Sequence, residues 1–179
     1  RSRGRGDVYK RQLVFGGTMT AASEQTVPSL DVVALLESSQ ASAWPQLHIN
    51  LSEAQSEWHR ALTETSPQMA TEWHDGEWSA LELARHMVNW MRLVSSALAN
   101  VCVSEEAALG NENFLPGNPD LARVLQEHER WADELRMATT TVAKLPERGP
   151  VIGAGIGPLT ARQVVGLTIA HLGEHAMQL

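Results

Sequence analysis

Two histidines lie four residues apart near the end of the chain, at His171 and His175, and a glutamine follows at Gln178. On an α-helix, residues four apart point in nearly the same direction and lie about 6 Å apart along the axis, so both imidazoles can reach one metal ion. The same spacing also occurs in polar stripes of soluble helices that bind nothing. A third ligand from another segment is therefore needed before the pair indicates a metal site.

The best third ligand is His86, which lies in a predicted helix that opens at Ser79. Apolar residues recur there at alternating intervals of three and four, and His86 borders this apolar stripe. Three neutral imidazoles that meet inside a helical bundle would hold one divalent metal and leave coordination positions open for water or substrate. The alternative for His86 is a histidine at the edge of the core that is hydrogen-bonded to a backbone carbonyl.

The other four histidines are weaker candidates. His48 and His59 have no partner at helical spacing, and His74 falls in a predicted loop. His128 takes a core position on a predicted helix, where it could be a substitute or extra ligand. Cys102 is the only cysteine and lies between two valines, so we interpret it as a buried, unreactive thiol, and an internal disulfide is excluded.

Three more polar residues lie one helical turn from a proposed ligand on the same face of its helix: Glu82, Asn89 and Gln178. Each is a candidate for holding a ligating imidazole through its second nitrogen, because such rings usually need an acceptor there. Trp90 is a candidate for the wall of the pocket, although tryptophan at this position also suits ordinary core packing.

Breaks in the apolar periodicity divide the chain into helices. Proline and glycine clusters at 67–76, 110–119 and 146–158 separate segments with helical spacing. The predicted helices run from about Trp44 to Thr65, from Ser79 through Val101, after Pro119 through Val142, and from Thr160 onward, with a shorter piece around Leu30 to Glu37. With no convincing period-two alternation, these segments predict an all-α four-helix bundle with the metal site between helices two and four.

Local signals mark how two of these helices begin. Ser79 with Glu82, and Thr160 with Gln163, have the spacing of a capping box, in which each side chain satisfies a free backbone N–H at the start of a helix. The glycine-rich stretch 153–158 lacks the ending of a phosphate-binding loop and follows no clear strand. We interpret it as a flexible connection into the last helix, near the mouth of the site.

The first twelve residues differ from the rest of the chain. They carry five of its fourteen basic residues and no apolar periodicity, and residues 7–12 resemble the translation of a sequencing adapter. We therefore interpret residues 1–18 as a non-native or disordered leader with Met19 as the natural start, 19–43 as a partly helical extension and 44–179 as the bundle. Because the chain ends one residue after Gln178, we also expect its last helix to be cut short.

Charge argues against a nucleic-acid partner. Without residues 1–12 the basic count falls from 14 to 9 and the acidic count from 21 to 20, a net charge of −11. The remaining basic residues are scattered, whereas phosphate-binding surfaces need clusters of them. The sequence shows no apolar run of membrane-span length and no signal-peptide pattern. We expect a cytoplasmic protein with a small-molecule substrate and with neither a nucleic-acid nor a membrane partner.

The run WHDGEWSALELARH over residues 73–86, followed after a long interval by His171, His175 and Gln178, resembles the DinB-like family of metal-binding four-helix bundles. In that pattern a Trp-Ser pair precedes helix two, one histidine lies seven residues after the serine, and an H-x3-H pair on the last helix completes the site. The position of His86 matches this spacing. The resemblance covers residues 44–179.

This resemblance implies that His86, His171 and His175 bind a divalent metal, either zinc or nickel. In characterised relatives the metal serves transfer or isomerisation reactions that use a low-molecular-weight thiol such as bacillithiol or mycothiol. By this resemblance the chain is expected to be a metal-dependent thiol transferase or isomerase. The family also makes a homodimer plausible.

Two other functions stay open at this point. The bundle could bind a metal or a small ligand without catalysis. Residues 171–175 also match H-x-x-E-H, in which Glu174 would be the general base of a metallopeptidase. That function needs a further carboxylate ligand downstream, and Glu174 points about 100° away from its neighbour His175 on a helix.

Overall fold

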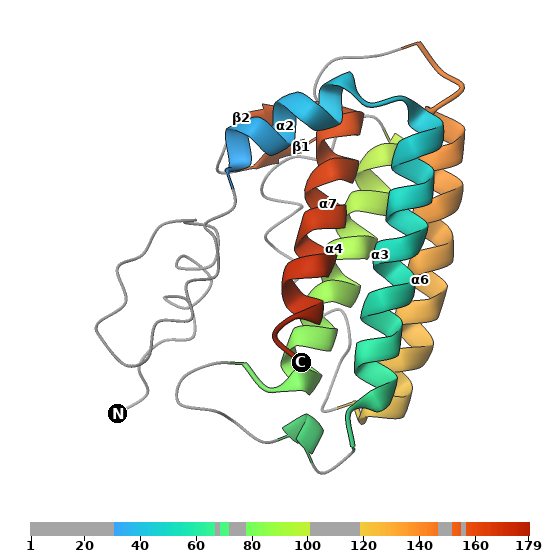
Figure 1. Ribbon diagram of the computed structural model, residues 1–179. Helices are drawn as coiled ribbons and strands as arrows, with labels where there is room; N and C mark the ends of the chain where they lie inside the picture. Colours follow the sequence, from blue (N-terminus) through green and yellow to red (C-terminus); the bar gives the residue numbers. More distant parts are fainter. Residues whose placement is uncertain (1–30, 67–68, 72–77, 101–118, 147–151, 155–156) are drawn as a thin grey trace, which may run out of the picture.

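The computed structural model describes residues 31–66, 69–71, 78–100, 119–146, 152–154 and 157–179. The predictions about the leader, His74 and Cys102 lie outside these residues. Within them, the long helices are α3 (Trp44–Glu64), α4 (Ala80–Asn100), α6 (Leu121–Val142) and α7 (Ala161–Ala176). They form a bundle (Figure 1), so the predicted all-α fold is confirmed.

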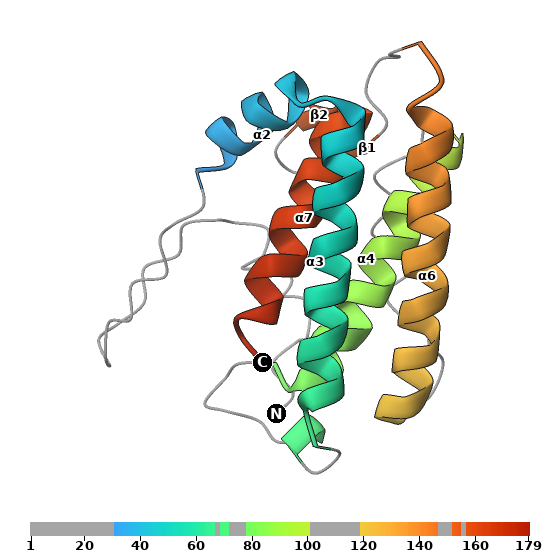
Figure 2. The same ribbon diagram turned by 45° about the vertical axis from the view of Figure 1, so that its right-hand side comes forward.

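The four helices run in two directions. α3 and α7 run parallel to each other, and α4 and α6 run in the opposite direction (Figures 1 and 2). α4 packs mainly against α6, and α3 mainly against α7. The start of α4 therefore lies at the same end of the bundle as the end of α7, although these segments are far apart in the sequence.

The core fills the space between these helices. Its largest fully buried side chains come from all four of them: Trp58, Leu51 and Leu62 of α3, Met87, Met91, Val88 and Val94 of α4, Leu135 and Val124 of α6, and Leu172 and Val164 of α7. Most occupy positions three or four residues apart on their helix, which is the spacing that places side chains on one face. The apolar residues that recur at helical spacing in the sequence therefore form the core of the bundle.

Both predicted capping boxes are present. The backbone N–H of Gln163 donates to Thr160 Oγ1, and the backbone N–H of Thr160 donates to Gln163 Oε1. At the start of α4, Glu82 N–H donates to Ser79 Oγ at 3.3 Å and Ser79 N–H donates to Glu82 Oε2 at 3.4 Å. Each box satisfies backbone donors that a helix start would otherwise leave free, so the two helices that carry the candidate ligands begin where predicted.

A shorter helix, α2 (Val32–Ala41), crosses the N-terminal end of α7 (Figure 1). The two helices approach closely because Gly166 of α7 has no side chain. A Cβ atom at that position would lie 1.8 Å from Ser39 Oγ and 2.5 Å from Ser39 Cβ. Thr160 Oγ1 also lies 2.6 Å from Gln40 Oε1, and Arg162 donates to the carbonyl of Ser42 at 3.0 Å. α2 is therefore packed onto the helix that carries two candidate ligands.

Two short strands precede α7, β1 (Ile152–Ala154) and β2 (Gly157–Leu159), and they pair antiparallel with Ile152 opposite Leu159. The sequence showed no clear strand before the glycine-rich stretch and placed this stretch near the mouth of the site, and both expectations were wrong. The hairpin precedes the first turn of α7, whereas His171 and His175 lie in its last turns. Each strand has three residues, and the pair contains two glycines and a proline, so no alternation of apolar and polar residues could reveal it. Leu159 is buried and joins the main core, which fixes this hairpin to the bundle.

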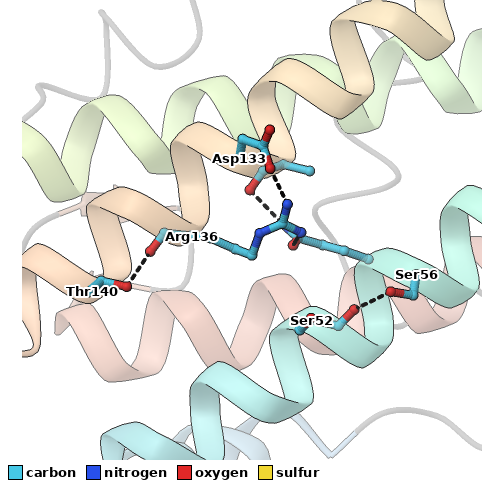
Figure 3. A network of polar contacts seen from close by, with 7 residues as sticks. Ser52, Ser56, Asp133, Arg136 and Thr140 are labelled. Atoms are coloured by element: carbon cyan, nitrogen blue, oxygen red, sulfur yellow. Dashed lines mark hydrogen bonds and ion pairs between the residues drawn. The ribbon is translucent and has the colours of Figure 1, made fainter.

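Polar contacts connect α3 with α6, as Figure 3 shows for the region around Arg136. Gln55 Nε2 donates to the carbonyl of Ala132 at 3.3 Å, and Arg136 donates to Gln55 Oε1 at 3.1 Å. Arg136 also pairs with Asp133 one turn earlier on α6. Because Gln55 is buried, these bonds fix the position of α3 along the axis of α6.

A 3-10 turn, η1 (Met69–Thr71), contacts α4.

Candidate metal centre

The three predicted ligands meet at one end of the bundle. His86 comes from the second turn of α4, and His171 and His175 come from the last turns of α7. His86 Nε2 lies 3.1 Å from His171 Nε2, and His175 Nε2 lies 2.7 Å from the same atom. Among the described residues, these are the three histidines, cysteines or acids that group closely enough to hold a metal, with their ligand atoms within 4.8 Å of one another.

The spacing of the three nitrogens fits a shared ion. Two nitrogens bound at about 2.1 Å to a tetrahedral zinc ion lie about 3.4 Å apart, and in an octahedral arrangement about 3.0 Å apart. The separation of 3.1 Å between His86 and His171 lies within this range, and the separation of 2.7 Å between His171 and His175 lies below it. A small outward movement of the His175 ring would therefore admit the ion between the rings.

Hydrogen bonds alone do not satisfy this arrangement. Gln178 Oε1 lies 2.6 Å from His175 Nδ1 and accepts its proton, so a neutral His175 has a lone pair on Nε2. His171 Nε2 can donate to that lone pair. The same nitrogen then has neither a proton nor a lone pair left for His86 Nε2, because a ring nitrogen has only one of the two in its plane. A cation placed between three unprotonated nitrogens satisfies all of them.

Burial keeps these rings neutral. Removal from water is the largest cause that lowers the pKa of His86 to about 3, and proximity to His175 lowers it further. Burial and the two neighbouring imidazoles hold the pKa of His171 well below its usual value. The pKa of His175 is also lowered by burial, with an opposing effect from Gln178 and Glu174. At neutral pH all three rings therefore have the unprotonated form that a metal requires.

The structure places the three residues that were predicted to hold the ligating imidazoles in different surroundings. Gln178 contacts His175 directly and holds its orientation. Glu82 instead bonds to Ser79 in the capping box of α4. Asn89 Oδ1 is buried without a hydrogen-bond partner among the described residues. Of these three residues, Gln178 is the one whose hydrogen bond to a candidate ligand the described structure shows.

A tryptophan lies against each of the three rings. The Trp78 ring is 4.9 Å from that of His86, with the planes at 72°, and the Trp90 ring is 4.9 Å from that of His171, at 70°. Trp90 Nε1 donates to Thr168 Oγ1 at 3.0 Å, which fixes this ring beside the site, as expected for a wall residue.

The third tryptophan, Trp58 of α3, is fully buried, and its ring lies 6.3 Å from that of His175. The motifs of the sequence do not connect Trp58 to the site. Its helical position predicts burial, whereas its neighbour on α7 depends on how two helices distant in sequence pack. Each of the three candidate ligands thus has a tryptophan ring beside it.

The other described histidines lie outside this group. His128 is buried in α6, and its ring is 5.7 Å from that of His59 on α3. Both of its nitrogens lack a hydrogen-bond partner among the described residues. Burial is the first cause that lowers the pKa of His128 to about 4, followed by His59 and Arg136. The structure therefore does not bring His128 to the candidate centre as a substitute ligand.

Comparison with known proteins identifies the family. The model of the DinB superfamily matches residues 40–179. The chain belongs to the DinB superfamily. No curated protein and no solved structure matched the chain in the corresponding comparisons. Membership and the grouping of three histidines together agree with the resemblance seen in the sequence.

Among the described residues of this DinB-superfamily protein, no helix has the length and apolar character needed to cross a bilayer. This agrees with the absence of a long apolar run in the sequence.

Proposed function

We propose that this protein binds one divalent metal ion through Nε2 of His86, His171 and His175. Zinc is the ion we propose first, with nickel as the alternative. One observation carries the proposal: the Nε2 atoms of three neutral histidine rings lie close together, and hydrogen bonds among them cannot satisfy all three. Three protein ligands leave at least one position of the ion for a small molecule, as in catalytic rather than structural sites.

We further propose that the small molecule is a low-molecular-weight thiol and that the reaction is attack of its thiolate on an electrophile, with loss of the thiol proton, or a thiol-dependent isomerisation. When bound, the metal would lower the pKa of the thiol and favour the thiolate, which is the nucleophilic form. Gln178 keeps the Nε2 atom of His175 free for the ion. Trp78 and Trp90 cover two of the rings and limit access of water.

Elemental analysis of purified full-length variants tests the metal site. His86→Ala and His171→Ala each remove one nitrogen from a site in which the remaining two cannot hold the ion firmly, so bound metal should fall from about one ion per chain to near zero. His59→Ala is the matched control, because His59 is a half-exposed histidine outside the group. Circular dichroism should show similar helicity in all variants. Unchanged metal content in His86→Ala and His171→Ala would remove the ligand assignment.

Absorption spectroscopy of the cobalt-loaded protein separates the transferase from a protein that only binds metal. A thiol that coordinates cobalt should produce a charge-transfer band from sulfur to metal in the near ultraviolet, and His171→Ala should not produce it. Bacillithiol, mycothiol and cysteine are suitable probes. Metal uptake with no such band for any of these thiols would favour the non-catalytic function over thiol transfer.

A further inference from the structure

Trp58 has an indole N–H for which the described part of the chain offers no acceptor. The side chain is fully buried in α3, and Nε1 is among the buried polar atoms without a hydrogen-bond partner. Buried donors in folded proteins are almost always paired with protein or ordered water. Among the described residues this donor has no acceptor, so a bound molecule is a candidate partner for it.

The position of Trp58 indicates where that partner would be. Its ring lies 6.3 Å from the ring of His175, tilted by 53°. Nδ1 of His175 donates to Gln178, and its Nε2 atom is a proposed metal ligand. His175 therefore does not accept from Trp58, and a molecule bound at the centre would lie near this ring.

Trp90 provides an internal comparison at the same site. Its Nε1 donates to Thr168 Oγ1 at 3.0 Å, and that hydroxyl donates in turn to the carbonyl of Val164 at 2.8 Å. The indole of Trp90 is thus paired inside the protein, whereas that of Trp58 is not. The lack of a partner at Trp58 is consequently specific to this residue and not a general property of tryptophans around the centre.

We propose that the indole N–H of Trp58 donates a hydrogen bond to the non-protein ligand of the three-histidine centre. The proposal rests on the metal site proposed above. The ligand atom that faces Trp58 must be an acceptor, so the class of ligand is an anion or a thiolate. Aromatic rings and uncharged imidazoles surround this atom, and in such an environment a single N–H donor favours a negatively charged partner strongly. Trp58 is thereby a ligand-binding residue that selects for charge.

Nuclear magnetic resonance of the zinc-loaded full chain tests the contact directly, with azide as an anionic acceptor probe. The chain has six tryptophans, so six indole N–H signals are expected. The signal that Trp58→Phe removes should show the largest downfield shift when azide is added. The signal of Trp90 should move less, since its proton is already bonded. If Trp58→Phe does not fold, contacts to neighbouring protons assign the wild-type signal. A Trp58 signal that azide does not move would overturn the proposal.

Affinity provides the second measurement. Trp58→Phe keeps an aromatic ring and removes the N–H, so the dissociation constant of azide from the cobalt-loaded protein should rise roughly tenfold, as expected for one hydrogen bond to a charged ligand. Trp44→Phe is the control, because Trp44 begins the same helix about 21 Å away. Equal azide affinity in Trp58→Phe and wild type overturns the proposal alone. A wild-type protein that takes up no cobalt instead overturns the proposed function, and this inference with it.

Discussion

Gln178 determines which nitrogen of His175 faces the centre. Its Oε1 atom accepts the proton of Nδ1, and Nε2 is left with the lone pair that a metal needs. The residue lies three positions after the histidine and beyond the last residue of α7, Ala176. This contact is local in sequence, and the spacing of the two residues made Gln178 a candidate for it.

His128 presents a different case, because its two nitrogens are buried without partners in the described structure. Its folded pKa is about 4, below the usual 6.5, so an unfolded chain binds a proton that the folded chain rejects. Protonation of the unfolded chain at His128 therefore costs no stability above pH 6.5, and the folded state loses stability as the pH falls from there to about 4. His59 on α3 and Arg136 on α6 are the charged or titratable groups that strengthen this shift.

We predict that His128→Leu raises the free energy of unfolding by about 1 kcal/mol at pH 7, since two unpaired buried atoms are removed. The variant should also lose less stability than wild type between pH 6.5 and pH 4. Urea unfolding of the metal-free proteins at several pH values measures both effects. Lower stability of the variant at pH 7 would show that a buried water satisfies His128 and would contradict the prediction.

At the scale of elements, the contact between α2 and α7 depends on a glycine. A Cβ atom at Gly166 would overlap Ser39, whose own hydroxyl donates to the carbonyl of Leu35 at 2.7 Å and cannot turn away without losing that bond. Alanine is favoured over glycine inside a helix by about 1 kcal/mol. The overlap should cost more than this gain, because overpacked contacts commonly cost about 1–3 kcal/mol.

We predict that Gly166→Ala lowers the free energy of unfolding by about 1 kcal/mol net. Gly173→Ala in the same helix is the matched control, because its added Cβ would meet no atom within 4 Å. That variant should be more stable than wild type by up to about 1 kcal/mol. Thermal unfolding of the pair measures the difference. Equal effects of both substitutions would show that α2 does not pack on α7 as described.

These elements also show what the sequence could predict and what it could not. The starts of α4 and α7 followed from Ser79 and Thr160, because a capping box is formed by residues three apart. The β1–β2 hairpin did not follow, since strands of three residues with glycine and proline have no periodic pattern. The close approach at Gly166 and the position of Trp58 beside His175 depend on packing between distant helices, which spacing within one helix does not encode.

The candidate centre was predictable to a similar extent. The His171 and His175 pair is a local pattern, and a shared ion requires only that both lie on one helix. Adding His86 required the order of motifs typical of a family, because the site joins residues 85 positions apart. The roles expected for Glu82 and Asn89 rested on being one turn away from a ligand. The carboxylate of Glu82 instead accepts hydrogen bonds from the backbone N–H and the hydroxyl of Ser79.

At the scale of the whole molecule, a metal at this centre connects α4 to α7, which meet through fewer contacts than α3 and α7 or α4 and α6 do. An ion that binds only the folded chain stabilises it by mass action, by about 2.7 kcal/mol when its free concentration is 100 times its dissociation constant. The α3–α7 pair meets the α4–α6 pair through two contacts, α3 with α6 and α4 with α7. The ion would strengthen the less extensive of these, the contact between α4 and α7.

The homodimer stays a prediction, which the mass of the protein in sedimentation equilibrium checks.

We predict that zinc raises the melting temperature of the metal-free protein by roughly 5–10 °C under these conditions, on the scale expected for a domain of this size. Chelation by EDTA should reverse the shift. His86→Ala should show little of it, because the variant lacks the ligand from α4. A shift of the same size in His86→Ala would mean that zinc stabilises the protein from another place.

The tryptophans that surround the three histidines have a practical consequence. Among the described residues, the indoles of Trp58, Trp78 and Trp90 lie beside rings at the centre. Part of the intrinsic ultraviolet emission of the protein therefore comes from this location. Copper or nickel arriving there would quench that emission, whereas zinc would change it without quenching, so occupancy can be followed in solution with no added dye.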